Sequence, residues 1–177
     1  MLQRMEMKDF DIVYSLMKNS FLYDEYRSYN EQKELLNNPK YTVYILPNDE
    51  GGIKAFISVF HFDGFAFIEH FAVDPNHRNQ GIGSVVLKAL KSILRCQICL
   101  EVELPETELA KRRISFYERN HFYLNNYPYV QPPFSDDKCS IPLLVMTTDH
   151  AISVAEFEQI KTVLFREVYQ VHEGSKK

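Results

Sequence analysis

The feature that most constrains the fold is a set of three strand-like segments joined by very short turns. Residues 41–46, 53–62 and 65–73 are rich in Val, Ile, Phe and Tyr. The connections at residues 47–52 and 63–64 are turn sequences rich in Asn, Asp and Gly. Such short connections join only antiparallel neighbours, because a parallel pair requires a long crossover. This region therefore predicts an antiparallel meander.

Directly after the meander, the pattern changes to a helix and a further strand. Residues 83–94 place apolar side chains on one helical stripe, and residues 98–104 alternate large apolar side chains with Cys and Glu. A strand, a helix and a second strand within about 40 residues predict a βαβ unit with parallel pairing and a right-handed crossover. The chain is therefore expected to mix antiparallel and parallel pairing.

The remaining segments complete an α+β (α/β mixed) order of α, α, β-meander, α, β, α, β, α. Capping-box spacings, which open helices, occur at Ser28 with Glu31 and at Ser153 with Glu156. The other predicted elements are helices at residues 9–21 and 106–120, a strand at residues 141–146 and a loop at residues 22–30. Residues 123–134 are an aromatic and proline-rich segment with no predicted helix or strand.

Composition narrows the class of protein. The chain has 177 residues, 45% of them hydrophobic and 25% charged, which fits a single globular domain over residues 1–177. A net charge of −4 gives no electrostatic reason to expect a nucleic-acid partner. No signal core is present and no apolar run approaches about 18 residues, so we expect a soluble, cytoplasmic protein with no membrane partner.

The three cysteines, Cys96, Cys99 and Cys139, do not form a repeated pattern. Cys96 and Cys99 make a CxxC, which is compatible with a redox pair or with half of a zinc site. A zinc site needs two more ligands at suitable spacing, whereas small thiols between a helix and an apolar run pack well. We therefore expect packing and no metal.

The segment after the third meander strand carries the strongest chemical signal. A short loop leads to Gly81-x-Gly83 at the start of a helix. Glycines allow close approach to the backbone, and the first amides of a helix have no internal acceptor, so with the helix dipole they favour a phosphate. The spacing differs from the dinucleotide fingerprint and from a Walker loop. By itself it is also compatible with a simple tight turn.

The residues around this turn closely resemble the acetyl-CoA signature of the GNAT superfamily of N-acetyltransferases. They read Ala72-Val73-Asp74-Pro75 followed by Arg78-Asn79-Gln80-Gly81-Ile82-Gly83. The run at residues 115–122, Ser-Phe-Tyr-Glu-Arg-Asn-His-Phe, is similar to the FYExxGF segment of that family. The resemblance covers residues 41–123 and suggests a small stand-alone member of bacterial type. It implies a three-layer fold, with a mixed sheet of about six to seven strands flanked by helices.

The resemblance implies an acetyl-CoA site built from one strand and the loop after it. The strand residues Phe71, Ala72 and Val73 would line the pantetheine arm, with backbone groups of Phe71 and Val73 facing it. The pyrophosphate would be bound by Arg78, Asn79, Gln80, Gly81, Ile82, Gly83 and Ser84. The chemistry of the helix start independently favours an anion there.

Tyr117 matches the tyrosine that protonates the departing CoA thiolate in many relatives, although core packing is an alternative role. For the base, Glu69 lies on a strand with an aromatic face, where we expect burial to raise its pKa. His70 is expected on the opposite face. Glu101 and Glu103 are alternatives for the base or for binding a cationic substrate, unless they form a solvated edge.

The sequence departs from the family pattern at two positions. His121 replaces the usual glycine before Phe122, where a left-handed conformation is expected at modest cost. Ala110 replaces an asparagine that contacts pantetheine or water in many relatives. The basic run 111–113 is expected on a solvated helix face rather than on CoA phosphates.

These features together predict an acetyltransferase that moves acetyl from acetyl-CoA to a primary amine of a small molecule by direct attack. A strand amide, predicted at Val73, would stabilise the oxyanion. Alternatives are an inactive acyl-CoA-binding sensor or an enzyme acting on protein or peptide amines. The C-terminal helix is compatible with a homodimer. The acceptor is expected to contact aromatic and acidic residues, unless these rings pack in the core: Phe21, Tyr23, Asp24, Glu25, Tyr26, Tyr29, Tyr123, Tyr127, Tyr129, Gln131, Pro132 and Pro133.

Overall fold

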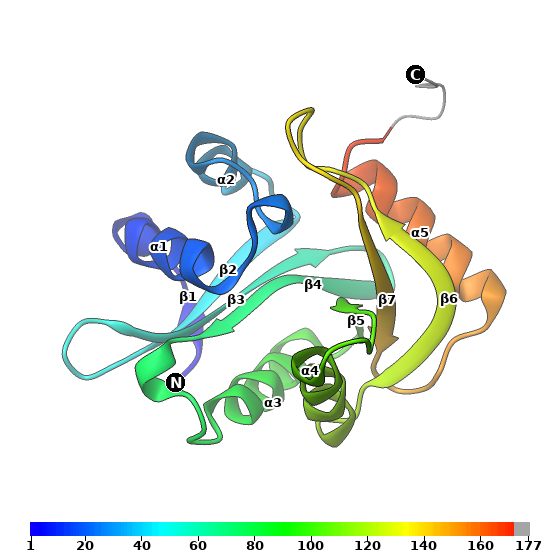
Figure 1. The fold of residues 1–177 in the computed structure, drawn as a ribbon. Coiled ribbons are helices and arrows are strands. Elements are labelled where there is room, and N and C mark those ends of the chain that lie inside the picture. The colour runs from blue at the N-terminus through cyan, green and yellow to red at the C-terminus, as the bar shows by residue number, and fades with distance from the viewer. Residues whose placement is uncertain (172–177) are drawn as a thin grey trace. The chain divides into compact units, whose positions relative to one another are not determined.

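A computed structural model describes residues 1–171 of the chain. Within these residues, seven strands and five α-helices form a mixed α/β fold, and the strand order of the sheet is β1-β2-β3-β4-β5-β7-β6 (Figure 1). The predicted fold class and the mixed sheet are confirmed. The chain divides into two compact units, Met1–Leu100 and the part from Glu101 onward, with the boundary inside β5 (Gln97–Glu103).

The first unit is built on the predicted meander. Strands β2 (Tyr41–Pro47), β3 (Ile53–His61) and β4 (Phe65–Val73) pair antiparallel, as their short turns require. The two-residue strand β1 (Gln3–Arg4), which is too short to give a periodic signal, pairs with β2. The predicted parallel pairing after the meander is also confirmed, because β4 pairs parallel with the first part of β5.

Helices cover both faces of the meander in the first unit. Figure 1 shows α1 (Phe10–Ser20) on one side of β3 and β4 and α3 (Ile82–Leu94) on the other. The helix α2 (Tyr29–Leu35) begins at the predicted capping box, in which the Ser28 side chain accepts from the Glu31 amide. The core of this unit contains ten large, fully buried side chains: Met17, Ile45, Phe56, Ile57, Phe60, Phe67, Leu87, Leu90, Ile98 and Leu100. Each contributes about 1.5–3 kcal/mol of hydrophobic stabilisation.

A β-bulge interrupts the pairing of β3 with β4. His70 lies opposite Ser58, but the next residue of β3, Val59, lies opposite Ile68. Glu69 is therefore the extra residue of β4. Such an insertion leaves one residue outside the ladder and breaks the regular alternation of side chains between the two faces of the sheet.

The pairing of β4 with β5 covers only the first part of β4. It runs from Phe65 opposite Gln97 to Ile68 opposite Leu100. The bulged residue follows immediately, and residues 69–73 extend beyond this paired part. The end of β4 is therefore held in the first unit by β3 on one side.

The second unit contains the end of β5, two helices and a strand pair. Helix α4 (Glu108–Arg119) and helix α5 (Val154–Glu167) agree with the predictions, and α5 begins at the predicted Ser153 capping box. Strand β7 (Ile141–Thr147) pairs antiparallel with β6 (Tyr123–Gln131).

The aromatic and proline-rich segment at residues 123–134, for which the sequence predicted no helix or strand, contains β6 over residues 123–131. Pro128 lies inside this strand, although proline cannot donate to a strand ladder. The structure accommodates it in an irregularity, since the register of β6 against β7 shifts between Asn125 and Tyr129. Asn125 is buried there and donates to the carbonyl of Val145 at 3.1 Å.

None of the three cysteines, all within the described residues, forms a disulfide. Cys99 is buried, as the packing interpretation predicted, but Cys96 is exposed, because it follows the end of α3 before β5 begins. Residues 1–171 contain no group of three or more His, Cys, Asp or Glu side chains arranged to hold a metal ion. No helix in the same residues combines the length and apolarity needed to cross a membrane.

Candidate active site

The loop between β4 and α3 is an ordered turn that exposes the start of the helix. Asp74 caps the short 3-10 helix at Pro75–His77 by accepting from the Asn76 amide at 2.9 Å. Two residues that follow, Asn79 and Gly81, adopt positive φ angles of 61° and 75°. These conformations bring the chain sharply into α3.

The start of α3 has the character of an anion site. Gly81 is its N-cap residue and provides no side-chain acceptor for the first-turn amides. Those amides, which begin at Ile82 and include Gly83 and Ser84, lie at the positive end of the helix dipole. The structure thus brings Arg78, Asn79, Gln80, Gly81, Ile82, Gly83 and Ser84 into one turn, as the phosphate prediction requires.

The end of β4 presents its backbone away from β3. The Asp74 amide donates to the Lys54 carbonyl oxygen at 2.8 Å, so Asp74 faces β3. Because backbone groups alternate in direction along a strand, those of Phe71 and Val73 point to the side opposite β3. The Arg78 guanidinium Nε donates to the Val73 carbonyl at 3.0 Å. This contact ties residues 78–84, called the phosphate turn below because of the pyrophosphate predicted there, to the strand predicted to line the pantetheine arm.

Glu69, the predicted base, is buried in an ion pair that the sequence did not reveal. Its Oε1 lies 2.5 Å from NH1 of Arg27, and the two side chains are 2% and 11% exposed. Burial raises the pKa of Glu69, but Arg27 and His70 more than offset it and lower the pKa to about 2. The prediction of a raised pKa is therefore wrong, because it considered the aromatic neighbours and not the cation.

His70 does not point away from Glu69 as the simple alternation predicted. The bulge brings the two side chains together, with His70 Nδ1 3.4 Å from Glu69 Oε2. His70 Nε2 lies 2.7 Å from the carbonyl oxygen of Glu25, which can only accept, so Nε2 carries a proton. His70 Nδ1 also lies 3.5 Å from the hydroxyl of Ser58.

Further polar groups extend this buried cluster toward β2 and α2. Gln32 donates to the Tyr41 hydroxyl at 2.8 Å, and both side chains are buried. Burial and the nearby Glu69 carboxylate raise the pKa of Tyr41, which keeps its phenol protonated. Sequence patterns gave no signal for Arg27, Gln32 or Tyr41, because only the fold brings them to β4.

Tyr117 lies in the second unit on the last turns of α4. Its half-buried ring packs against Phe116 and Phe122, with centroids 5.2 and 5.6 Å away. Burial raises the pKa of Tyr117 to about 12, although Arg113 acts in the opposite direction. The phenol is therefore protonated at neutral pH, as a proton donor to a thiolate must be.

The two departures from the family pattern are both accommodated in the second unit. His121 adopts the predicted left-handed conformation, with φ of 61°. The amide of the next residue, Phe122, donates to the backbone carbonyl oxygen of Tyr117 at 3.0 Å. Ala110 is buried in the first turn of α4, and its amide donates to the N-cap hydroxyl of Thr107 at 3.1 Å.

The two acidic residues of β5 differ in exposure, since Glu101 is partly buried and Glu103 forms an exposed pair. Glu101 accepts from the hydroxyls of Tyr129 and Tyr169, the latter at 2.7 Å. Glu103 pairs with Arg113 at 2.6 Å. Both contacts lie within the second unit.

On α4, the basic run 111–113 is exposed, as expected. Lys111 pairs with Glu108 at 2.9 Å, while Arg113 pairs with Glu103 on β5. These pairings agree with a solvated helix face that is laced with surface ion pairs.

Most of the aromatic residues expected to contact an acceptor pack within their own units. In the first unit, Tyr14 packs against Tyr26 and Tyr29, and Phe21 packs against His70 at 4.9 Å. In the second unit, the ring-packing residues are Tyr127, Tyr129, Phe157, Phe165 and Tyr169. Tyr23 and Tyr123 are exposed.

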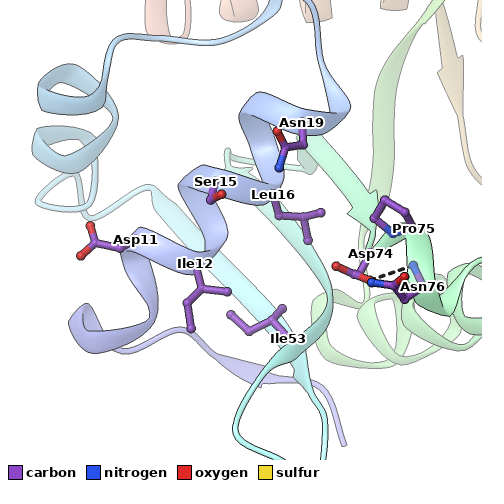
Figure 2. Close-up of a pocket in the computed structure, with 9 residues that line it drawn as sticks. All are labelled: Asp11, Ile12, Ser15, Leu16, Asn19, Ile53, Asp74, Pro75 and Asn76. Atoms are coloured by element: carbon purple, nitrogen blue, oxygen red, sulfur yellow. Dashed lines mark hydrogen bonds between the residues drawn. The ribbon is translucent and has the colours of Figure 1, made fainter.

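A groove of about 550 Å³ lies beside the phosphate turn in the first unit (Figure 2). Residues of α1, including Asp11, Ser15 and Asn19, form one wall, and Asp74–Asn76 form part of the other. Figure 2 shows the Asp74 carboxylate engaged by the Asn76 amide rather than directed at a ligand.

The family of this chain follows from its similarity to known proteins. The sequence matches the acetyltransferase (GNAT) family over residues 9–122. YjbC of Bacillus subtilis (strain 168), whose description names an acetyltransferase, is 32% identical over 112 residues. That match covers 62% of this chain and 55% of YjbC, so the chain spans about half the length of this curated relative.

Solved structures support the same class over nearly the whole chain. A GNAT-family protein of Bacteroides thetaiotaomicron has a TM-score of 0.89 and 32% identity, covering 97% of this chain and 99% of that one. A variant of Vibrio cholerae spermidine N-acetyltransferase shares the fold at 17% identity, with a TM-score of 0.61 and coverage of 84% and 94%. The chain therefore belongs to the acetyltransferase (GNAT) family.

Proposed function

We propose that this N-acetyltransferase moves the acetyl group of acetyl-CoA to a primary amine of a small molecule, with both substrates bound together. The whole chain, residues 1–177, would act as one catalytic domain. The proposal rests on the start of α3, which has no side-chain cap, in a chain that belongs to this family. This helix start lies just after the end of β4, where backbone groups face away from β3.

The coenzyme site is proposed at the end of β4 and the turn after it. Backbone groups of Phe71 and Val73 would face the pantetheine arm, with Ala72 between them held by β3. The first-turn amides of α3 and the side chain of Arg78 would bind the pyrophosphate. The Val73 amide is proposed to stabilise the oxyanion that forms when the amine attacks the thioester.

Proton transfer is assigned to two residues. Tyr117 would donate to the thiolate as the thioester breaks, and its raised pKa of about 12 supports a protonated phenol. Glu69 would take a proton from the amine through Oε2, the oxygen that Arg27 does not hold. A carboxylate with a pKa of about 2 binds protons weakly, so it can relay a proton but cannot store one.

The alternative is an acyl-CoA-binding sensor without transferase activity. The ion pair between Arg27 and Glu69 favours it, because the pair reduces the basicity of the carboxylate. An enzyme acting on protein or peptide amines would differ only in its acceptor. The phosphate turn would serve all three.

Turnover of acetyl-CoA with a panel of small amines tests the proposal. Release of CoA thiol is followed for each amine, and binding of CoA is measured separately by calorimetry. Turnover with a small primary amine supports the proposed function. Tight CoA binding without acetylation of any amine, peptide amines included, would establish the sensor, and turnover with peptides alone would redirect the acceptor.

Gly81→Ala is expected to weaken CoA binding. At φ of 75° an L-residue is strained by about 1 kcal/mol, although the added Cβ meets no atom within 4 Å. The strain is relieved by shifting the turn, which moves the first-turn amides off the pyrophosphate. We expect about a tenfold weaker Kd by calorimetry.

The matched control is Gly64→Ala, which has φ of 83° and equally open space in the β3–β4 hairpin. Both variants should lose similar stability, but only Gly81→Ala should lose affinity. Equal CoA affinity in the two variants would place the pyrophosphate elsewhere.

A further inference from the structure

The groove beside the phosphate turn has a polar and an apolar strip along α1. Asp11, Ser15 and Asn19 are spaced four residues apart, so their side chains form one row on the surface of the helix. Ile12 and Leu16, spaced in the same way, form a second row next to it. A ligand that has a polar head and a short apolar body would match these two rows.

The apolar part of the groove is incompletely covered by the chain itself. Leu16 and Ile53 are each 6% exposed, whereas Ile12 is 45% exposed. Figure 2 shows Leu16 extending from α1 toward the wall formed by Asp74–Asn76. A ligand that covers these side chains removes apolar surface from water, which favours binding.

Two carboxylates give the groove a negative charge. Asp11 accepts from the Tyr29 hydroxyl at 2.6 Å, and Asp74 accepts from the Asn76 amide at 2.9 Å, each through Oδ1. Asp74 Oδ1 also lies 3.3 Å from Nδ1 of His77. Among residues 1–171, neither carboxylate pairs with a lysine or an arginine, and none of the 9 residues that line the groove is basic. The groove therefore attracts cations and repels anions.

Hydrogen-bond acceptors for a cation remain available on α1. In the described part of the chain, neither the Ser15 hydroxyl nor the Asn19 side-chain amide is bonded to another protein group. Each offers an oxygen that can accept from an ammonium N–H. Asp74 contributes its charge from the opposite wall, and the volume of about 550 Å³ falls in the range of small-molecule sites.

We propose that this groove binds a small organic cation that consists of one ammonium group and a short alkyl chain. The ammonium group donates to Ser15 or Asn19 and lies opposite Asp74, while the alkyl chain covers Ile12 and Leu16. Among the described residues that line the groove, none belongs to the phosphate turn, so this site is separate from the proposed coenzyme site. The inference goes beyond the proposed function and does not require that the bound cation is acetylated.

CoA bound at the proposed coenzyme site would strengthen the binding of this cation. The wall formed by Asp74–Asn76 continues directly into the phosphate turn, and the Asn76 carbonyl accepts from the Gln80 side chain at 3.3 Å. The negative phosphates of CoA would therefore lie close enough for their attraction to the cation to be screened incompletely. Thermodynamic linkage requires that each ligand then raises the affinity for the other by the same factor.

Calorimetry with N,N-dimethylbutylammonium tests the site, because this tertiary ammonium cannot be converted to an amide. We expect a Kd of about 1 mM or tighter, and no binding of butanoate or butanol. Ser15→Lys places a positive charge in the groove and should weaken cation binding by at least tenfold, roughly. The matched control is Ser92→Lys, the same substitution at an exposed serine of α3 on the other side of β3 and β4, which should bind as the wild type does.

The results with the two variants decide the inference. Loss of cation binding in Ser15→Lys alone supports the groove. Absence of binding, equal binding of butanoate, or equal affinity in the two variants overturns it, since a cation held at the acceptor site would bind to both variants alike. Should Ser15→Lys not fold, NMR of the wild type replaces it. A shift of the Asn19 side-chain amide signals during the titration supports the site, and unchanged signals exclude it.

A repeat of the titration with bound CoA separates this inference from the proposed function. At low salt we expect the cation to bind about fivefold tighter than without CoA, and the gain should disappear at high salt. The same cation affinity with and without bound CoA would overturn the proposed pyrophosphate position and leave the groove supported. A protein that binds the cation in the groove but acetylates no amine would overturn the proposed function alone.

Discussion

Replacing Tyr117 by Phe is expected to lower kcat by about 10²–10⁴-fold, the usual contribution of a general acid. The variant loses only the hydroxyl, while the ring keeps its contacts with Phe116 and Phe122. The amount of folded protein and the affinity for acetyl-CoA should therefore be close to wild type. A steady-state assay together with a thermal melt of both proteins measures the two effects separately.

The pH dependence gives a second check on this role. A general acid must be protonated, and a pKa of about 12 keeps the Tyr117 phenol protonated throughout the neutral and mildly basic range. No basic limb from this residue is expected below about pH 11. Glu158→Gln, which changes an exposed side chain on α5 in the same unit, is the control. Wild-type kcat in Tyr117→Phe would assign the proton donor to another group.

The second large effect concerns stability. Glu69→Gln is expected to reduce the free energy of unfolding by about 3–5 kcal/mol, because it breaks the nearly buried ion pair with the Arg27 guanidinium. Lowering the pKa of this carboxyl from its ordinary 4.5 to about 2 corresponds to a contribution of about 3 kcal/mol, of the same size. Urea denaturation at neutral pH measures the loss.

The sign of the pH effect follows from the lowered pKa. Ionised Glu69 stabilises the folded chain fully above pH 4.5, and the contribution is lost as the pH falls toward about 2. Glu69→Gln should lack this part of the acid sensitivity. Glu103→Gln is the control, since its exposed pair with Arg113 is worth at most about 1 kcal/mol. Equal losses in the two variants would contradict a special role for the buried pair.

Local patterns were sufficient for most elements of this chain. The meander follows from turns too short for any other pairing, and α2 and α5 begin at capping boxes that can be read from Ser28 and Ser153 alone. Strand β6 was missed because Pro128 disfavours a strand, and only pairing with β7 overrides that preference. Where local propensity was ambiguous, tertiary contacts determined which secondary structure formed.

The candidate site also has one part that the sequence predicted and another that it did not. The phosphate turn was predictable because its glycine spacing and its position after a strand both lie within a few residues. The environment of Glu69 was not, since Arg27 is 42 residues away and no periodicity links the two. The bulge also escaped prediction, because an extra residue in one strand becomes visible only against its partner.

The extra residue in β4 affects how this chain must be compared with its relatives. Glu69 interrupts the alternation of side chains between the two faces of the sheet, so the residues before it and after it follow two different patterns. An alignment that matches only the two ends of β4 therefore assigns the side chains of one half to the wrong face. Chimeras that exchange the strand should therefore keep Glu69 as the anchor of the alignment. Deleting Glu69 would restore a regular ladder and leave the backbone groups of Phe71 and Val73 directed away from β3.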